Sequence, residues 1–283
     1  MDEESKKANN IVVCFPARNE ENLLTRVLNS LEQQTHKPIK VIIADDGSED
    51  KTVEIAQAFE FVEIHRREKR GFDVVGKIEM GKVWNSSLTP ARDVHKETSI
   101  EYIVFLGGDM VLPKNYLEDL VNKFDQDPKL MIAAGTMVGE NAYTSTGFMI
   151  PGPGRMMRYS YWEKLGSEYP LKQGWEAYPV YMANMEGYKS KIFDDIEYEP
   201  LRITGGRTDY YAYGMAMKAF GYFFLFAIGR SFKQIFMRSR GFSACYNMLK
   251  GFLFGKPEKY EKELRQFVNK SQRKRLRKLI FRF

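Results

Sequence analysis

Three carboxylates of this 283-residue chain lie shortly after runs of apolar residues. Asp45 and Asp46 come after the apolar run 41–44, and Asp109 comes after the run 102–106 and two glycines. In open α/β sheets, ligands bind outside the carboxyl ends of the strands. Acids in these places could therefore bond to a ligand or to a divalent cation. Ordinary turns between a strand and a helix are the alternative explanation for both motifs.

A strand and a helix precede the first of these motifs. Residues 11–15 are continuously apolar, and Pro16 is expected to end that strand because it has no N–H donor. Leucine and valine then recur at helical spacing over residues 23–31. The chain thus predicts a strand, a polar loop and a helix before Asp45 is reached.

The Asp45-Asp46 motif belongs to a second unit of the same kind. Gly47 permits a sharp turn, and Ser48 or Asp50 is expected to cap the following helix. Two successive strand-helix units predict a parallel sheet with right-handed crossovers. The loops after the two strands should then face each other at one edge of the sheet.

Asp109 lies at the end of a third predicted strand. Residues 102–106 predict that strand, and residues 115–124 predict the helix after it. Gly107 and Gly108 permit close approach of a bulky ligand to the backbone. A single carboxylate at this place can hold one coordination position on Mg²⁺ or Mn²⁺.

Three segments resemble, in order and spacing, the nucleotide-sugar domain of family 2 glycosyltransferases with the GT-A fold. They are Pro16-Ala17-Arg18-Asn19-Glu20, Asp45-Asp46-Gly47-Ser48-Glu49-Asp50 and Phe105-Leu106-Gly107-Gly108-Asp109. Residues 81–85 resemble the helix before the metal-motif strand, and residues 154–166 resemble the acceptor-side loop and helix. The resemblance covers roughly residues 10–205 and implies an α/β fold with a mostly parallel central sheet flanked by helices.

The resemblance implies a donor pocket for a UDP- or GDP-linked sugar. A carboxylate in a partly closed crevice accepts a charge-assisted hydrogen bond from an N–H group of uracil or guanine, and Asp45 or Asp46 is expected to do so. The residues that match the family's donor-binding positions are Pro16, Ala17, Arg18, Glu20, Asp45, Asp46, Lys82, Gly108 and Asp109.

The family's metal motif, Asp-x-Asp, is altered in this chain. Asp109 matches the second acid and is expected to be catalytic and to hold Mg²⁺ or Mn²⁺, but Gly107 replaces the first acid. The donor's diphosphate leaves readily only when its charge is neutralised. Three outcomes are open: Asp109 holds the metal with phosphate and water, Lys77, Lys82 or Arg155 supplies the positive charge, or activity is weak or absent.

The segment 171–178 resembles the family's Glu-Asp-x-Glu motif, with Gly174 in place of the usual catalytic base. Glu176 remains as a second candidate catalytic residue, and a solvated glutamate at a helix start is the alternative. A polyprenyl phosphate acceptor would need no base, because its attacking oxygen is already ionised. A weaker likeness to polyprenyl-phosphate-mannose synthases accompanies this interpretation. Acceptor-binding roles are expected for Arg155, Trp175, Arg202 and Arg207, with surface ion pairs as the alternative for Arg202 and Arg207.

Charge is distributed unevenly along the chain. Residues 218–283 carry 17 Lys and Arg against 3 Glu, whereas the preceding residues carry 26 basic and 34 acidic side chains. The longest apolar run, 219–229, is shorter than the roughly 20 residues of a membrane-spanning helix. Aromatic and basic residues interleave here, which predicts an interfacial helix on an anionic membrane; packing on the catalytic domain is the alternative. No nucleic acid is expected, because no RNA-binding module is recognisable and the remainder is acidic.

These patterns predict a catalytic domain over 1–215, with a donor half at about 10–135 and an acceptor half at about 136–215. A basic, aromatic-rich helical extension over 216–283 follows. Cys14 and Cys245 lie in distant apolar segments, which favours a reducing compartment, and no signal peptide is visible. A peripheral location on the cytoplasmic face of a membrane is therefore expected.

The predicted function is inverting transfer of a sugar from a nucleotide diphosphate sugar to a lipid-linked acceptor. Gly107 and Gly174 replace two expected acids, so a non-catalytic or degenerate nucleotide-sugar or lipid-binding relative is the alternative. A dehydrogenase is excluded because the first loop has no glycine. A haloacid-type phosphatase is excluded because Ala44 stands at the nucleophile position.

Overall fold

The computed structural model describes residues 10–69, 77–142, 149–203, 209–236 and 241–280. The chain forms two compact units. Unit 1 comprises Met1–Phe72, Val83–Glu168 and Gly187–Thr204. Unit 2 comprises Asp73–Lys82, Tyr169–Glu186 and Gly205–Phe283.

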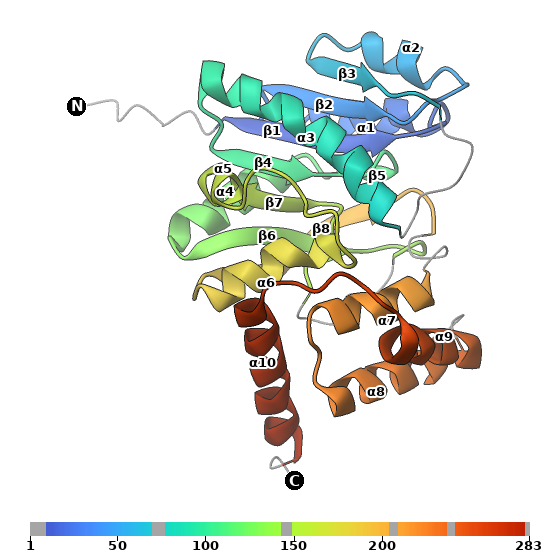
Figure 1. The fold of residues 1–283 in the computed structure, drawn as a ribbon. Coiled ribbons are helices and arrows are strands. Elements are labelled where there is room, and N and C mark those ends of the chain that lie inside the picture. The colour runs from blue at the N-terminus through green and yellow to red at the C-terminus, as the bar shows by residue number, and fades with distance from the viewer. Residues whose placement is uncertain (1–9, 70–76, 143–148, 204–208, 237–240, 281–283) are drawn as a thin grey trace, which may run out of the picture. The chain divides into compact units, whose positions relative to one another are not determined.

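The described part of unit 1 is built on an eight-stranded sheet in the order β3-β2-β1-β4-β7-β6-β8-β5 (Figure 1). Strands β1 to β4 are parallel where they pair, whereas β7 is antiparallel to β4 and β6. Strand β8 is parallel to β6 and antiparallel to β5. The strands are β1 Ile11–Ala17, β2 Lys40–Asp45, β3 Val62–Arg66, β4 Tyr102–Phe105, β5 Met110–Val111, β6 Leu130–Met137, β7 Arg155–Arg158 and β8 Lys189–Pro200.

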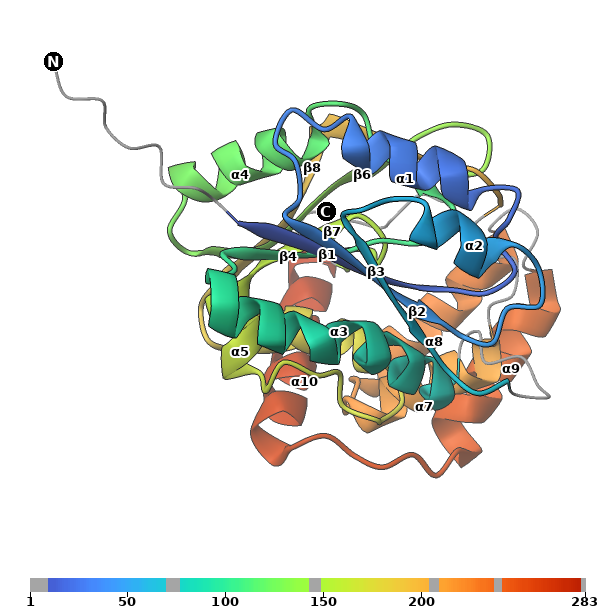
Figure 2. The ribbon, with the colours of Figure 1, turned by 90° about the horizontal axis from the view of Figure 1, so that it is seen from above.

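Helices cover both faces of this sheet. In Figure 2, α1 and α4 lie on one face and α3 and α5 on the other. Helix α1 buries Leu24, Val27, Leu28 and Leu31, which recur at the spacing that the sequence predicted. The helices that lie wholly or mostly in this unit are α1 Leu24–Glu32, α2 Thr52–Gln57, α3 Ile78–Thr98, α4 Tyr116–Gln126 and α5 Tyr159–Lys164.

The predicted mostly parallel α/β sheet with flanking helices is confirmed, but Pro16 does not end the first strand. β1 continues to Ala17 and still pairs with β2 there. Pairing with β4 stops at Cys14, whose carbonyl accepts from Leu106 N. Backbone groups two residues apart in a strand point to the same neighbour, so the N–H position of Pro16 points toward β4, as that of Cys14 does. Because pairing with β4 has already ended there, the missing N–H costs no hydrogen bond of the sheet.

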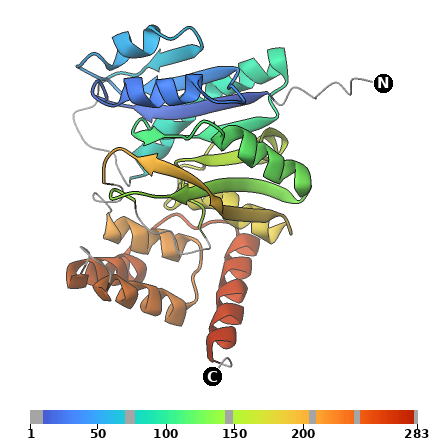
Figure 3. The ribbon, with the colours of Figure 1, turned by 180° about the vertical axis from the view of Figure 1, so that it is seen from behind.

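Unit 2 is helical in its described residues, and α7, α8 and α9 lie side by side in Figure 3. Its elements include η1 Trp175–Ala177, α6 Tyr178–Met185, α7 Tyr210–Ala219, α8 Phe224–Lys233, η2 Gln234–Phe236, α9 Gly241–Phe254 and α10 Lys262–Ile280. Glycines allow α7 and α9 to approach closely, because a Cβ at Gly251 would lie 2.0 Å from Tyr211 O.

The apolar run 219–229 does not form one helix. α7 ends at Ala219 and α8 begins at Phe224, with Gly221 between them at φ +66°. That left-handed conformation suits glycine and breaks the helical path. Among the described residues, no helix combines the length and the apolar character that crossing a membrane requires.

Candidate functional site

The loops after β1 and β2 are joined by hydrogen bonds at the carboxyl edge of the sheet. Asn19 N donates to Ser48 Oγ at 2.9 Å, and Glu49 N donates to Asn19 Oδ1 at 2.9 Å. Glu20 N donates to Thr52 Oγ1 at 2.7 Å. The two loops therefore lie side by side, as the order of strands and helices predicted.

Asp50, rather than Ser48, bonds to the first turn of α2. Thr52 N donates to Asp50 Oδ1 at 3.0 Å, whereas Ser48 Oγ is used by the neighbouring loop. Gly47 has φ +76°, and a Cβ there would lie 2.7 Å from Lys69 Cα. The turn after Asp46 therefore requires glycine both for its conformation and for its close approach to the chain after β3.

Two arginines at the end of β3 pair with the carboxylates after β2. Arg66 Nε lies 3.5 Å from Asp45 Oδ2, and Arg67 Nε lies 3.4 Å from Asp46 Oδ1. Asp45 Oδ1 also accepts from Ser48 N at 3.1 Å. The side chains of Asp45 and Asp46 are at most 5% exposed. A ligand that bonds to either acid would therefore compete with a neighbouring arginine.

Arg202, which follows β8, bonds to the two remaining acids of this edge. Its Nε donates to Asp109 Oδ2 at 2.7 Å, and its Nη2 donates to Glu20 Oε1. Burial raises the pKa of Glu20, although the charge of Arg202 lowers it. Burial alone would lower the pKa of Arg202, but Asp109 and Glu20 outweigh it and raise that pKa. The guanidinium therefore stays positively charged between two carboxyl groups.

The side chains of these acids occupy the space beside the two glycines that precede Asp109. A Cβ at Gly107 would lie 2.6 Å from Asp109 Oδ1, and a Cβ at Gly108 would lie 3.3 Å from Glu20 Cγ. The carboxylate of Asp109 thus fills the space in which the first acid of the family's metal motif would begin. Gly108 lets the β4 loop approach the loop that carries Glu20.

The described residues do not fit a bound divalent cation in this arrangement. Asp109 and Glu20 are the available hard ligands, and both bond to Arg202. Within the described ranges, no group of three or more His, Cys, Asp or Glu side chains could hold a metal ion. The expected Mg²⁺ or Mn²⁺ ligand role of Asp109 thus remains a prediction.

Three other donor-site candidates shortly precede Glu20 in the chain. Pro16 and Ala17 are the last residues of β1, and Arg18 follows them as a half-buried side chain. Lys82, by contrast, is exposed on α3 and belongs to unit 2. The structure thus brings together the donor-site candidates of unit 1, while the role of Lys82 stays a prediction.

Arg155 is oriented by the fold of unit 1. It lies on β7, is fully buried, and donates to Pro151 O at 3.2 Å and Ile150 O at 2.6 Å. These hydrogen bonds hold the loop before β7 against the strand. A role for Arg155 in binding an acceptor remains a prediction.

The expected acceptor-side residues of segment 171–178 belong to unit 2. Glu176 is exposed in η1, and Trp175 Nε1 donates to Lys77 O at 3.4 Å. Gly174 has φ +81°, and a Cβ there would lie 2.8 Å from Phe220 Cε2. Close packing therefore excludes an acid at position 174 unless its neighbours move. Arg207 lies outside the described residues.

Sequence reasoning missed Arg66 and Arg67. A signal was present, because apolar residues alternate with polar ones from Val62 to His65 and two arginines follow. That pattern predicts one more strand with cations at its carboxyl end. Arg202 was found, but as a ligand of an acceptor phosphate rather than as a partner of Asp109.

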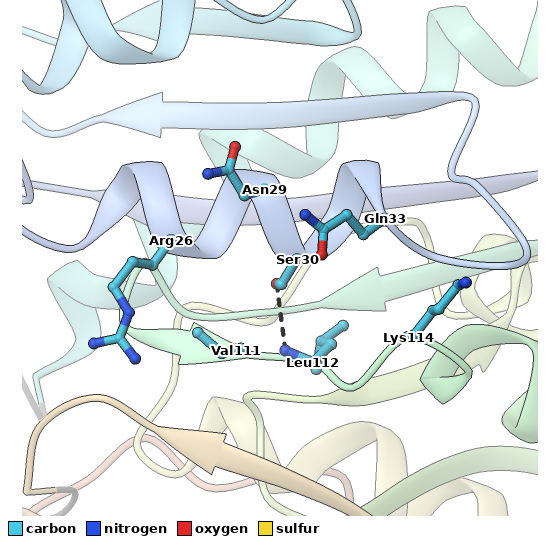
Figure 4. Close-up of a pocket in the computed structure, with 7 residues that line it drawn as sticks. All are labelled: Arg26, Asn29, Ser30, Gln33, Val111, Leu112 and Lys114. Atoms are coloured by element: carbon cyan, nitrogen blue, oxygen red, sulfur yellow. Dashed lines mark hydrogen bonds between the residues drawn. The ribbon is translucent and has the colours of Figure 1, made fainter.

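A separate surface hollow of about 270 Å³ lies between α1 and β5. Figure 4 shows Asn29 on α1 and Gln33 just after this helix above it, Lys114 at one end and Arg26 at the other. Ser30 Oγ accepts a hydrogen bond from Leu112 N at 3.3 Å across the hollow. None of its lining residues is one of the acids or arginines at the carboxyl edge of the sheet. The hollow is therefore separate from the site that the sequence predicted.

Comparison with known proteins agrees with this geometry. Residues 12–74 match the sequence model described as "Glycosyl transferase family 2". Over 196 residues the chain is 26% identical to Glycosyltransferase GlyA of Streptococcus pneumoniae serotype 4. That alignment covers 67% of this chain and 26% of GlyA, so the chain spans about a quarter of that relative's length.

Two solved structures share the fold at low sequence identity. S. aureus TarS 1-349 in complex with UDP-GlcNAc superposes with a TM-score of 0.56 at 16% identity, covering 86% of this chain and 71% of TarS. Mannosyltransferase PcManGT from Pyrobaculum calidifontis, in complex with GDP-Man and Mn²⁺, gives 0.52 at 15% identity, covering 87% and 70%.

The sheet with its carboxylate edge is a GT-A-type fold. The family model matched by residues 12–74 and the similarity to GlyA confirm the resemblance to family 2 glycosyltransferases that the sequence motifs indicated. Membership of the polyprenyl-phosphate-mannose synthase branch, which the weaker likeness suggested, stays a prediction.

Proposed function

We propose that this chain is a glycosyltransferase that moves a sugar from a nucleoside diphosphate sugar to an acceptor oxygen. The reaction would be a single displacement: the acceptor oxygen bonds to the anomeric carbon as the bond to the diphosphate breaks, which inverts that centre. The nucleoside diphosphate leaves with the electron pair.

One observation carries this proposal: four acids and three arginines from separate loops meet at the carboxyl edge of one sheet. The acids are Glu20, Asp45, Asp46 and Asp109, and the arginines are Arg66, Arg67 and Arg202. Carboxylates suit the N–H donors of a base, while guanidinium groups suit phosphate oxygens. Both classes of partner are present in a nucleotide sugar.

Asp45 or Asp46 would bond to the base. Either acid would then exchange its arginine for an N–H donor of uracil or guanine, and the displaced Arg66 or Arg67 would be available to the phosphates. The names of TarS and PcManGT complexes, with UDP-GlcNAc and GDP-Man, support the donor class for proteins of this fold.

The proposed acceptor is lipid-linked. Position 174, where the family has its base, is a glycine that close packing requires. An ionised lipid phosphate needs no proton removed, so positioning can replace a base. A sugar hydroxyl on a lipid carrier would need a base, for which Glu176 is the candidate.

We further propose that unit 2 binds the cytoplasmic face of an anionic membrane. Large apolar side chains of α8, η2 and α9 are 45% to 86% exposed: Phe224, Leu225, Phe232, Phe236, Phe242, Tyr246, Leu253 and Phe254. The same helices carry Arg230, Lys233 and Lys250. Exposed aromatic rings beside cations suit the interface of a bilayer with acidic headgroups.

The transfer proposal can be tested with purified full-length protein. UDP- and GDP-sugars are incubated with polyprenyl phosphate in detergent, with and without Mg²⁺ or Mn²⁺, and release of UDP or GDP and glycosylated lipid is measured. At least one donor should yield product, and Asp109→Asn should lower its rate at least about a hundredfold. Asp109 would act through the cation that it holds, and this is the scale of losing one group that stabilises the leaving charge.

A non-catalytic relative is the competing candidate, favoured by Gly107 and Gly174. It would bind a nucleotide sugar and release neither nucleotide nor glycosylated lipid. Product formation that is unchanged in Asp109→Asn would contradict the role given to Asp109. Glu97→Gln, on α3 away from the carboxylate edge, serves as the control and should keep the wild-type rate.

A further inference from the structure

Arg202 lies at the carboxyl edge of the unit 1 sheet and is held there by two acids. Its Nε donates to Asp109 Oδ2 at 2.7 Å, and its Nη2 donates to Glu20 Oε1. The side chains of Asp109 and Glu20 are 14% and 6% exposed, whereas that of Arg202 is 54% exposed. Two largely buried carboxylates therefore orient a guanidinium that stays accessible to a ligand.

The guanidinium of Arg202 has N–H groups that the acids do not use. Nε and Nη2 donate to the carboxylates, whereas Nη1 donates to no residue in the part of the chain that the structure describes. Guanidinium groups match phosphate oxygens in both geometry and charge. The unused donors therefore suit a phosphate ligand, and Arg202 can bind one without leaving its two acids.

The arrangement of these acids suits an arginine better than a divalent cation. Gly107 stands where the family's metal motif has its first acid, and a Cβ there would lie 2.6 Å from Asp109 Oδ1. Asp109 and Glu20 each give an oxygen to Arg202, and a divalent ion would need further hard ligands that the described residues do not supply. The cation that this pair of acids holds is a guanidinium.

We propose that Arg202 neutralises the charge of the leaving diphosphate, which is the role that a divalent cation has in the family's metal motif. This inference rests on the proposed sugar transfer. As the acceptor oxygen bonds to the anomeric carbon, the bond from that carbon to the β-phosphate oxygen breaks, and the oxygen keeps the electron pair. Negative charge grows on the β-phosphate, and the unused N–H groups of Arg202 donate to it.

The proposal gives different roles to the three residues. Arg202 contacts the donor's leaving group, rather than the acceptor phosphate that the sequence suggested. Asp109 and Glu20 are positioning residues, because they act on the diphosphate through the guanidinium. An ion pair that only supports the fold is the alternative, and it would affect stability without distinguishing one phosphate group from two.

The test compares nucleoside diphosphates with monophosphates by calorimetric titration of the full chain in EDTA. UDP is compared with UMP, and GDP with GMP. For at least one base, wild type should bind the diphosphate about tenfold or more tightly than the monophosphate, the scale of a hydrogen bond to a charged group. In Arg202→Gln this preference should fall to within about twofold, while the affinity for the monophosphate stays unchanged.

Two further variants separate the charge of Arg202 from its place in the fold. Arg202→Lys keeps a positive charge and should keep part of the preference for the diphosphate. Arg92→Gln is the matched control, because Arg92 is another arginine of unit 1 that pairs with a carboxylate, Glu168, at 2.9 Å. Its preference should equal that of wild type. Thermal unfolding verifies that each variant is folded.

The transfer assay supplies a second readout. Product should form in EDTA, and Arg202→Gln should lower the rate at least about a hundredfold. Three results would overturn the role of Arg202 and leave the transfer proposal standing: a preference or product that appears only with Mn²⁺, a wild-type preference in Arg202→Gln, or an equal loss in Arg92→Gln. No nucleotide binding with or without Mn²⁺ would contradict both proposals.

Discussion

At the scale of single residues, arginines neutralise the charge of the acids at the carboxyl edge of the unit 1 sheet. Asp45 and Asp46 are nearly excluded from solvent, and each lies within 3.5 Å of a guanidinium nitrogen. A buried carboxylate is stable only when such partners or hydrogen bonds compensate for the lost hydration. A base that binds here would have to offer N–H donors that compete with an arginine for the carboxylate.

Replacing the acid that bonds to the base should weaken nucleotide binding with little change in shape. Asp45→Asn and Asp46→Asn keep the size of the side chain but remove the charge that strengthens the hydrogen bond. The variant of whichever acid contacts the base should bind the nucleotide about ten- to a hundredfold more weakly. This loss is equivalent to a charge-assisted hydrogen bond of about 1.5–3 kcal/mol. Isothermal titration with UDP and GDP measures this loss.

Asp93→Asn provides the control for these variants. Asp93 is exposed on α3 and pairs with Lys96 at 2.7 Å. Its replacement should leave nucleotide affinity unchanged. Wild-type affinity in both Asp45→Asn and Asp46→Asn would remove the base-recognition role from this motif.

At the scale of elements, glycines decide how closely helices of unit 2 can pack. α7 and α9 meet at Gly214 and Gly251, and a Cβ at Gly214 would lie 2.1 Å from Met248 O. These contacts involve backbone atoms, which cannot rotate away as a flexible side chain can. Close packing here depends on two residues that have no side chain.

Gly251→Ala should therefore destabilise the protein although alanine favours helices. The new methyl would lie 2.0 Å from Tyr211 O, and overpacking of this kind costs about 1–3 kcal/mol. Gly229→Ala on α8 is the matched control, because nothing lies within 4 Å of its Cβ position. It should be neutral or stabilising by up to about 1 kcal/mol.

The midpoint of urea unfolding, followed by circular dichroism, measures both changes. Equal midpoints for Gly251→Ala and Gly229→Ala would mean that α7 and α9 are not packed as described. A lower midpoint for Gly229→Ala alone would contradict both the open surroundings of Gly229 on α8 and the close packing of α9 on α7.

Most of the sheet's parallel part could be predicted from the sequence. Apolar runs of strand length alternate with helical spacing, and parallel pairing then brings the strand ends together. The end of β1 could not be predicted from Pro16 alone, because the cost of a missing N–H depends on which neighbour strand it faces. The neighbour on that side is β4, whose pairing with β1 ends at Cys14, and β4 is distant from β1 in the sequence.

The site was predictable in its acids and less so in its cations. Asp45, Asp46 and Asp109 stand directly after recognisable strands. Arg202 meets Asp109 only because β8 pairs with β5, an antiparallel contact that no local pattern indicates. Gly174 shows the same limit, since only the packed Phe220 reveals why no acid stands there.

At the scale of the whole molecule, charge and exposed apolar surface coincide along the sequence. The last 66 residues hold 17 of the 43 basic side chains and most of the strongly exposed aromatic ones. Each basic residue near an anionic bilayer contributes about 1 kcal/mol, while inserted rings add burial of apolar area. Both contributions support binding to the same membrane.

The full chain should co-sediment with vesicles that contain phosphatidylglycerol and only weakly with pure phosphatidylcholine vesicles. Raising the salt concentration should release it, because the attraction is partly electrostatic. Phe242→Glu should weaken binding about tenfold or more, the scale of losing one inserted side chain. Ile39→Glu, an exposed apolar residue of unit 1, should not.

Equal binding to both kinds of vesicle at every salt concentration would contradict this role for unit 2. So would equal losses in Phe242→Glu and Ile39→Glu, because the effect would then not belong to the helices α8 to α9. Loss of vesicle binding would leave the donor site unaffected, since that site lies in unit 1.

The most direct test of the central claim is calorimetric titration of the full-length wild-type chain with UDP, GDP and their sugar conjugates, with and without Mn²⁺. The claim is that the carboxyl edge of the unit 1 sheet binds the nucleoside diphosphate of a sugar donor. We predict saturable binding of one nucleotide per chain for at least one of the two bases, weakened in Asp45→Asn or Asp46→Asn. No binding of any of these nucleotides under either condition would contradict the account.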